Sequence, residues 1–253
     1  MSARGGKKRK RLDLLLQERG LAGSREQARQ LIMDGEVLVD GFPAFKAEAL
    51  VPAAGSITLR KRRPYVSRGG LKLEAGLARF GIDPGGMICA DVGCSTGGFT
   101  DCLLQHGAAR VYSVDVGYGV LDWKLRKNER VVVLERTNAR YLTRTEIPEP
   151  LDLAVIDASF ISLELLLAPV QRLFEGEVTI IALVKPQFEL PREKVATGGV
   201  VRDGELHRES LEGVREYARK LGLVCADTME SPILGAKGNR EFLMLLTGGT
   251  SDE

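Results

Sequence analysis

Residues 87–99 read MICADVGCSTGGF, and they give the clearest indication of the fold. It opens with an apolar run, Met87–Val92, which predicts a buried strand. The glycines that follow, Gly93, Gly97 and Gly98, predict a tight turn from this strand into a helix. Such a turn lets the backbone approach a ligand closely and points free N–H groups towards it.

The chemistry of the turn favours one kind of ligand. The spacing Gly93-x-x-x-Gly97-Gly98 departs from the G-x-G-x-x-G pattern of dinucleotide-binding turns, and Asp91 precedes the first glycine. A carboxylate there can face the cationic methionine portion of S-adenosylmethionine, whereas it would repel a pyrophosphate. We therefore expect S-adenosylmethionine rather than NAD. The residues expected to bind it at this turn are Asp91, Gly93, Ser95, Gly97, Gly98 and Phe99.

Two further polar residues follow later strands of the same predicted sheet. Asp115 closes the run Arg110–Val114, and Asn138 comes just after the run Val131–Glu135. A carboxylate at that edge suits a bidentate hold on ribose hydroxyls, whichever of the two cofactors is bound. Asn138 is placed to contact the adenine edge, and an ordinary turn residue is an almost equal alternative. We include Asp115 and Asn138 in the expected cofactor site.

Outward from this turn, apolar runs alternate with helical segments, which predicts a doubly wound parallel sheet. Helices are expected up to Phe80, over Glu164–Phe174 and over His207–Leu221. A closing hairpin is expected to make the last strand antiparallel. The fold class is therefore α/β, with a Rossmann-like sheet and a small N-terminal α+β domain. The predicted strands are Met87–Val92, Arg110–Val114, Val131–Glu135, Leu151–Ile156, Val178–Val184, Val224–Met229 and Glu241–Leu246.

Four ionisable residues are expected at one edge of this sheet. Asp157 follows the fourth strand and Lys185 the fifth, and the carboxyl ends of parallel strands share an edge with the glycine turn. Glu241 begins the antiparallel strand at the same edge, and Lys72, on the helix before the first strand, can close over it. Each residue alone is better explained as a member of a surface ion pair, but the four together favour a catalytic site.

That arrangement suits methyl transfer to a hydroxyl group, which must lose its proton as the methyl group arrives. Burial and a neighbouring cation both favour the neutral amine of Lys185, which can then act as the base. Asp157 and Glu241 would orient the lysines and balance their charge. The rest of the rate acceleration is expected to come from aligning the hydroxyl group, the methyl group and the sulfonium.

Charge is divided unevenly along the chain. Residues 1–66 carry 14 lysines and arginines against 7 acidic residues, a net +7, and the remainder carries 22 against 27, a net −5. A small basic segment joined to a mildly acidic body is typical of a polyanion-binding module. A solvated basic tail without a partner is the alternative.

The basic segment shows the pattern of two short helices followed by a compact β part. Apolar residues recur at helical spacing from Leu12 to Leu16 and stop at Gly20, which is expected to end the first helix. Ser24 stands three residues before Gln27, a capping-box spacing that predicts the start of the second helix.

These residues resemble the alpha-L RNA-binding domain, first recognised in a small-subunit ribosomal protein. The resemblance rests on Arg11-Leu12-Asp13, Ser24-Arg25, Leu31-Ile32 and Gly35-x-Val37-x-Val39. It implies that an arginine-bearing helix lies against structured RNA, where cations neutralise phosphates without reading the bases. An ordinary exposed charged helix is the alternative. The expected RNA contacts are Arg11, Arg25, Arg29, Lys46, Arg62, Arg63 and Arg68.

Five motifs carry a further resemblance: Tyr65–Leu73, Asp91–Phe99, Ile156–Ser162, Leu183–Phe188 and Gly238–Glu241. With these motifs the whole chain resembles the TlyA family, which belongs with the FtsJ-like ribose 2′-O-methyltransferases. The resemblance implies a Lys-Asp-Lys-Glu tetrad at Lys72, Asp157, Lys185 and Glu241, and methylation of cytidine ribose in ribosomal RNA or ribosomal subunits. By the same resemblance, the compact ends of the chain favour the large ribosomal subunit as the substrate, and the small ribosomal subunit is the alternative.

The expected organisation has four parts. Residues 1–10 form a mobile basic arm, 11–59 the alpha-L RNA-binding domain, 60–66 a linker and 67–249 the FtsJ-like methyltransferase domain. The loop over Gln187–Gly204 is long and rich in glycine, which suggests a lid over the substrate.

The composition of the chain excludes several classes of protein and leaves two rival functions. Four cysteines without C-x-x-C spacing and two histidines argue against a metal site or a disulfide framework. We find no export signal and no apolar run of about 20 residues, so a cytoplasmic protein without a membrane partner is expected. The rivals are a membrane-active hemolysin, a name used for this family, and an RNA-binding protein that has lost catalysis.

Overall fold

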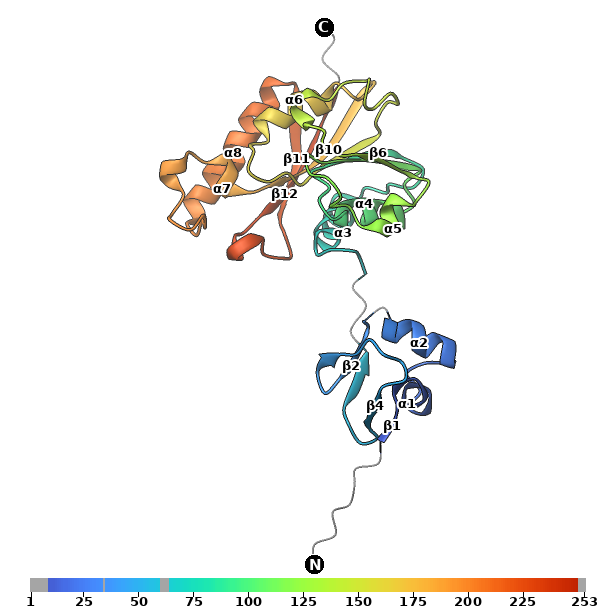
Figure 1. Ribbon diagram of the computed structural model, residues 1–253. Helices are drawn as coiled ribbons and strands as arrows, with labels where there is room; N and C mark the ends of the chain where they lie inside the picture. Colours follow the sequence, from blue (N-terminus) through green and yellow to red (C-terminus); the bar gives the residue numbers. More distant parts are fainter. Residues whose placement is uncertain (1–8, 34, 60–63, 250–253) are drawn as a thin grey trace, which may run out of the picture. The chain divides into compact units, whose positions relative to one another are not determined.

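The computed structural model in Figure 1 describes residues 9–33, 35–59 and 64–249. The chain divides into two compact units, Met1–Arg63 and Pro64–Glu253. Residues 1–8 of the expected arm and residues 60–63 of the expected linker, including Arg62 and Arg63, lie outside the described residues.

The N-terminal unit packs two helices against short antiparallel strands. Its core is apolar, and Leu12, Leu16 and Ile32 are fully buried in it. One sheet pairs β1 with β4, and the other has the order β3-β2-β5. The elements are β1 Arg9–Arg11, α1 Leu12–Glu18, α2 Arg25–Met33, β2 Val37–Val39, β3 Phe42–Pro43, β4 Leu50–Pro52 and β5 Ile57–Leu59.

The local signals in this unit act as expected, with one difference. The Ser24 hydroxyl accepts the backbone N–H of Gln27 at 3.0 Å, which caps α2. Gly20 follows α1 with a φ of 69°, a conformation that glycine adopts readily. Arg9 and Lys10 were expected in the mobile arm, but they pair with β4 as part of β1, so ordered structure begins before Arg11.

The C-terminal unit contains a seven-stranded sheet with the order β11-β12-β10-β9-β6-β7-β8. All its neighbouring strands are parallel except the pairs made by β12, which runs antiparallel to both β10 and β11. The doubly wound sheet and its antiparallel last strand are therefore confirmed. The strands are β6 Ile88–Val92, β7 Arg110–Val114, β8 Val131–Leu134, β9 Leu153–Ile156, β10 Glu177–Val184, β11 Leu223–Glu230 and β12 Phe242–Gly249.

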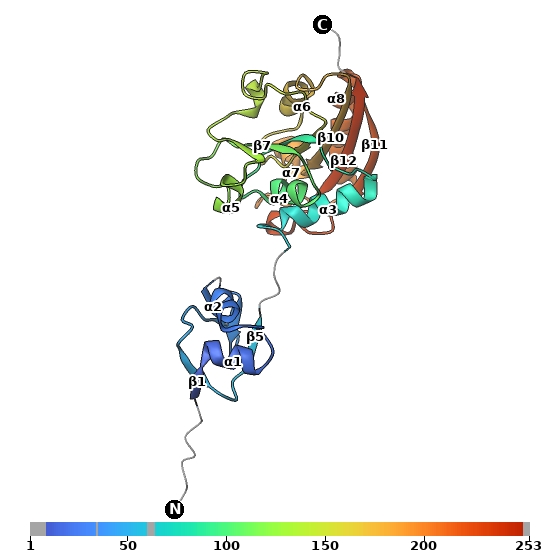
Figure 2. The same cartoon turned by 90° about the vertical axis from the view of Figure 1, so that its right-hand side faces the viewer.

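Helices cover both faces of this sheet (Figures 1 and 2). One face packs against α3 (Gly69–Phe80), α4 (Gly98–Gln105) and the short α5 (Trp123–Arg126). The other packs against α6 (Glu164–Gln171) and α8 (Gly204–Lys220). Alternate residues of the central strands enter the two cores, as expected for a sheet buried on both sides.

The start of this unit differs from the expected boundary. Tyr65 was expected in the linker, but its ring is 4% exposed and packs directly against Gly70 at the start of α3. The backbone N–H of Val66 donates to Asp101 on α4 at 2.8 Å. Both residues therefore belong to the packed C-terminal unit.

The segment expected to form a lid contains ordered structure. It includes α7 (Pro186–Glu189) and a 3₁₀ turn, η2, over Arg192–Lys194. Within the described residues, no helix combines the length and apolar character needed to span a membrane.

Candidate active site

Asp91, at the end of β6, is fully buried, and one of its carboxylate oxygens has no partner. Oδ2 accepts both the backbone N–H of Thr100 at 2.8 Å and its hydroxyl at 2.6 Å. The Thr100 hydroxyl in turn lies 2.8 Å from the Ser113 hydroxyl. Oδ1 is buried without a hydrogen-bond partner. Burial raises the pKa of Asp91 to about 7, so a cationic group beside Oδ1 would stabilise the carboxylate.

The glycine turn after β6 is shaped by its neighbours. Gly93 has a φ of 84°, and a Cβ there would lie 2.9 Å from the Asp157 carbonyl oxygen. Gly97 has a φ of 93°, and a Cβ there would overlap the side chain of Leu125. At Gly98 a Cβ would overlap the Ser67 hydroxyl. The glycines are therefore needed for close packing as well as for access to a ligand.

Asp115 and Asn138 lie at the same edge of the sheet. The two carboxylate oxygens of Asp115 accept the backbone N–H of Ser95 at 2.8 Å and of Gly117 at 2.7 Å. Asn138 uses its side-chain oxygen to accept the Arg140 N–H at 3.1 Å, which caps a 3₁₀ turn, η1, over Ala139–Tyr141. The side-chain oxygen of Asn138 therefore acts as an ordinary turn cap, while the residue also lines a cavity.

Two cavities meet at this edge and share Gly93, Ser95 and Asp157. The first has a volume of about 230 Å³ and is lined by Asp91, Gly98, Phe99, Lys72 and Arg68, among others. The second has a volume of about 570 Å³ and is lined by Asp115, Asn138, Phe160 and neighbouring residues. The expected cofactor residues therefore lie together, with the exception of Gly97, which packs beneath the turn.

The donor set fits S-adenosylmethionine. Asp91 lines the smaller cavity, and its unpaired oxygen can accept a hydrogen bond from a cationic amine. The larger cavity offers the Asp115 carboxylate and a mostly apolar lining, which suits a nucleoside. When bound, this cofactor would supply an activated methyl group on a sulfonium centre.

Lys72 and Glu241 form a buried ion pair. Nζ of Lys72, on α3, lies 2.5 Å from Glu241 Oε2, and their side chains are 11% and 3% exposed. Glu241 directly precedes β12, and its backbone carbonyl accepts the Ser231 N–H at 2.8 Å. Removing either partner would leave the other as an uncompensated buried charge, which is strongly destabilising, so the two side chains hold each other in position.

Lys185 and Asp157 form a second pair at the ends of β10 and β9. Nζ of Lys185 lies 2.6 Å from Asp157 Oδ1. The same ammonium donates to the Ala158 carbonyl at 3.0 Å and the Ser159 hydroxyl at 2.9 Å. These acceptors suit a charged amine with three N–H donors.

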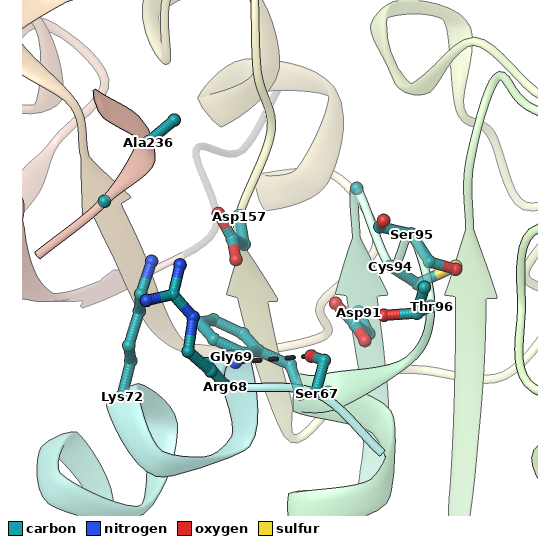
Figure 3. Close-up of a pocket in the computed structure, with 14 residues that line it drawn as sticks. Ser67, Arg68, Gly69, Lys72, Asp91, Cys94, Ser95, Thr96, Asp157 and Ala236 are labelled. Atoms are coloured by element: carbon teal, nitrogen blue, oxygen red, sulfur yellow. Dashed lines mark hydrogen bonds between the residues drawn. The ribbon is translucent and has the colours of Figure 1, made fainter. Parts of the chain in front are cut away.

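The two pairs meet at the smaller cavity, which Lys72 and Asp157 both line. Figure 3 shows Asp157 between the side chains of Lys72 and Arg68, which extend from the start of α3, and those of Asp91 and Ser95. The structure thus gathers the four predicted ionisable residues at one edge, and it also places Arg68 at the rim of their cavity.

Some residues that hold the site were not identified from the sequence. Thr100 anchors Asp91, and Ser159 contacts Lys185. Thr100 directly follows the motif Asp91–Phe99 and Ser159 lies within the motif Ile156–Ser162, but neither motif indicates which atoms these side chains contact. Asn239 is 2% exposed, accepts the Val201 N–H at 2.9 Å and donates to the Gly199 carbonyl at 2.8 Å. It therefore ties the end of the expected lid to the loop before Glu241.

The expected RNA-binding residues of the N-terminal unit include a tight cluster. Arg11, Arg25 and Arg29 all approach the carboxylate of Asp13. Lys46 is exposed and takes no part in that cluster. The structure brings three of the predicted contacts together.

The fold and site define a methyltransferase: a doubly wound sheet with one antiparallel strand, a glycine turn with a buried carboxylate, and a lysine–carboxylate site at the same edge. Residues 65–247 match the FtsJ-like methyltransferase family, and the chain belongs to that family. Residues 10–46 match the S4 domain, the module expected from the N-terminal pattern. The predicted family, fold class and S-adenosylmethionine cofactor are confirmed.

Similar proteins extend the match over nearly the whole chain. The 16S/23S rRNA (cytidine-2′-O)-methyltransferase TlyA of Mycobacterium tuberculosis is 45% identical over 94% of this chain and 90% of its own length. Hemolysin A of Brachyspira hyodysenteriae is 37% identical over 92% of this chain and 98% of its own length. The solved structure of a candidate hemolysin from Streptococcus thermophilus has a TM-score of 0.73 and 40% identity, covering 98% of this chain and 90% of that one.

Proposed function

We propose that this methyltransferase transfers a methyl group from S-adenosylmethionine to the 2′-hydroxyl of a cytidine in ribosomal RNA. The similar TlyA proteins of Mycobacterium tuberculosis and Campylobacter jejuni are named for 16S/23S and 23S rRNA respectively, so 23S rRNA is common to both names. Large-subunit RNA is accordingly the proposed substrate, small-subunit RNA is the second candidate, and the cytoplasm, where ribosomes are modified, is the proposed location.

The observation that carries this proposal is the pairing of both lysines with carboxylates at the cofactor edge. The pairs Lys72–Glu241 and Lys185–Asp157 bring two cations and two anions to one edge of the sheet, and one member of each pair, Lys72 and Asp157, lines the smaller cavity. A hydroxyl group is a weak acid, and its proton has to move to a base as the methyl group is transferred. A charge-balanced site can accept that proton without leaving an isolated buried charge.

The proposed roles follow from the contacts. Lys185 accepts the proton of the ribose hydroxyl after passing one of its own protons to Asp157 or solvent, because its ammonium is held by acceptors as the structure stands. Lys72 is oriented by Glu241 and stabilises negative charge that develops on the attacking oxygen. Asp91 and Asp115 hold the cofactor, so that the hydroxyl and the methyl group are aligned.

The RNA is proposed to bind the S4 domain and the rim of the cavity. Arg11, Arg25, Arg29 and Lys46 supply phosphate contacts on the N-terminal unit, and Arg68 supplies one beside the active site. These contacts position the RNA, and they do not identify a nucleotide.

The test is methyl transfer from labelled S-adenosylmethionine to unmethylated large subunits, small subunits and free rRNA. We expect the label in a cytidine of large-subunit RNA, at a nucleotide whose 3′ linkage resists alkaline cleavage. Label in small-subunit RNA alone would overturn the choice of subunit. Label in a base rather than in ribose, or no label despite cofactor binding, would overturn the proposed reaction.

A further inference from the structure

Asp13 is a buried carboxylate at the start of α1, and the proposed reaction does not use it. Its side chain is fully buried. Arg11 Nε donates to Oδ1 at 3.0 Å and Arg11 Nη2 to Oδ2 at 2.9 Å, a bidentate contact. The backbone N–H of Leu14 also donates to Oδ1 at 2.9 Å.

Two more guanidinium groups reach the same carboxylate from α2. Arg25 Nε donates to Asp13 Oδ2 at 3.1 Å, and Arg29 Nε lies 3.6 Å from that oxygen. Arg25 and Arg29 are one helical turn apart, so they share one face of α2. These ion pairs hold the pKa of Asp13 far below its usual range, and the carboxylate is therefore charged at any pH at which the protein is used.

The arginines remain available to a ligand. Their side chains are 36%, 39% and 49% exposed for Arg11, Arg25 and Arg29, whereas Asp13 has no exposure. A guanidinium has five N–H donors, and Asp13 accepts two hydrogen bonds from Arg11 and one from Arg25, while Arg29 contacts it only as an ion pair. The cluster therefore carries a net charge of +2 with free donors directed to solvent.

Without a shared anion, two effects would weaken ligand binding by three neighbouring arginines. Like charges repel each other, and each long side chain loses rotamer entropy when a ligand fixes it. A buried carboxylate that holds all three in advance reduces both costs. The loss of one unit of positive charge is the counter-effect.

We propose that Asp13 is a positioning residue for RNA binding, which arranges Arg11, Arg25 and Arg29 into a preformed surface for adjacent backbone phosphates. This inference deepens the proposed function and rests on it only in taking structured RNA as the ligand. It assigns no base recognition to the cluster, since phosphate contacts carry no sequence information.

The alternative is that Asp13 only lowers the positive charge of the surface, and the two ideas predict opposite results. The variant Asp13→Asn has nearly the same shape and adds one unit of net positive charge. Simple electrostatics predicts tighter RNA binding in this variant. If Asp13 positions the arginines, the variant binds RNA more weakly despite its higher charge.

The experiment measures the Kd of the full-length chain for deproteinised large-subunit rRNA, and for transfer RNA as an unrelated structured RNA, at several salt concentrations. For Asp13→Asn we expect the Kd for rRNA to rise about ten-fold and the salt slope to fall by about one to two phosphate contacts. The matched control is Asp40→Asn, which makes the same charge change at an exposed residue of the same unit. Asp40 also accepts a backbone N–H, that of Ser56 at 2.9 Å, and its variant should bind RNA equally or slightly more tightly.

A second variant does not depend on the stability of the first. Arg25→Lys keeps the charge of the cluster but replaces the fork-shaped donor with a point charge, so we expect RNA binding to weaken about three-fold. Unchanged or tighter binding in both Asp13→Asn and Arg25→Lys would overturn the proposal.

Methylation kinetics separate this proposal from the proposed function. In Asp13→Asn the KM for RNA should rise, while kcat and the Kd for S-adenosylmethionine stay unchanged, because Asp13 lies in the other unit from the cofactor residues. If the wild-type chain methylates no rRNA, the proposed function fails. If it methylates rRNA and the two variants match it in KM, the positioning role fails alone.

Discussion

The two units of this chain use carboxylates to hold cations in different ways. In the N-terminal unit one buried aspartate, Asp13, contacts three arginines that stay partly exposed and carry excess positive charge. In the catalytic unit each lysine has its own carboxylate, and both pairs are largely buried. An excess of exposed charge suits a polyanion in water, whereas balanced buried charge suits proton transfer. The ratio of cations to anions, and their exposure, thus distinguishes a binding surface from a reaction site.

The largest expected effect comes from breaking a balanced pair. Lys185→Met removes the proposed base, and we expect kcat to fall about 10³-fold while S-adenosylmethionine still binds. Single-turnover methylation and calorimetric cofactor binding measure the two effects. The matched control is Lys194→Met, which removes an exposed lysine paired with Glu209 in the same unit and should leave kcat unchanged. A kcat within a few fold of wild type in Lys185→Met would show that another group takes the proton.

The next effect concerns an unpaired carboxylate. The pKa of Asp91 is raised to about 7 and a cationic ligand requires its charged form, so cofactor affinity should rise with pH up to about 7 and then level off. Asp91→Asn should weaken binding about 10- to 100-fold at pH 8 and remove this pH dependence. Calorimetric titration between pH 5.5 and 8.5 checks both, and equal pH profiles for the two proteins would contradict the role of Asp91.

The same raised pKa affects stability without cofactor. The folded state binds more protons at Asp91 than the unfolded chain does between pH 3.8 and about 7. The contribution of Asp91 protonation to the free energy of unfolding is therefore fully present below pH 3.8 and is lost as the pH rises through 7. Relative to Asp91→Asn, the wild-type free energy of unfolding should fall over that range, as chemical denaturation can measure.

A smaller effect is expected where a neutral amide supports a charged pair. Asn239→Ala removes the hydrogen bonds to Val201 and Gly199, so the loop before Glu241 should loosen and kcat should fall about ten-fold. Deuterium exchange should become faster at residues 199–201. The matched control, Asn128→Ala, removes a turn amide that accepts the Arg130 N–H far from the site. Unchanged exchange at 199–201 would contradict the proposed tie.

The smallest effect is expected at a single exposed arginine. Arg29→Gln should raise the Kd for rRNA only about two- to three-fold and lower the salt slope by about one contact, because Arg29 is the most exposed and most distant partner of Asp13. Fluorescence anisotropy at several salt concentrations measures this. A loss as large as that of Asp13→Asn would mean that the three arginines do not share the ligand.

The fold could be predicted because its signals are local. β7 runs over Arg110–Val114 as the apolar pattern indicates, and the glycine turn lies where the sequence places it. The edge shared by Asp157 and Lys185 follows from strand direction alone. Which lysine pairs with which carboxylate does not follow, because Lys72 and Glu241 are 169 residues apart and their contact depends on packing across the sheet.

Boundaries and buried polar contacts were harder to predict for the same reason. Tyr65 reads as linker because it follows a run of charge, yet its ring fills a space beside Gly70 that only the folded unit creates. Asn239 and Thr100 look like ordinary polar residues until their partners are known. Asn138 is both a cap and a cavity residue, a combination that no sequence pattern distinguishes.

The position of β12 has a consequence for synthesis of the chain. This strand lies between β10 and β11, and Glu241 immediately precedes it, so neither the complete seven-stranded sheet nor the Lys72–Glu241 pair can form until residues 241–249 have been translated. The N-terminal unit, by contrast, is complete once its own residues emerge. A nascent chain could therefore fold its S4 domain well before it has a working active site.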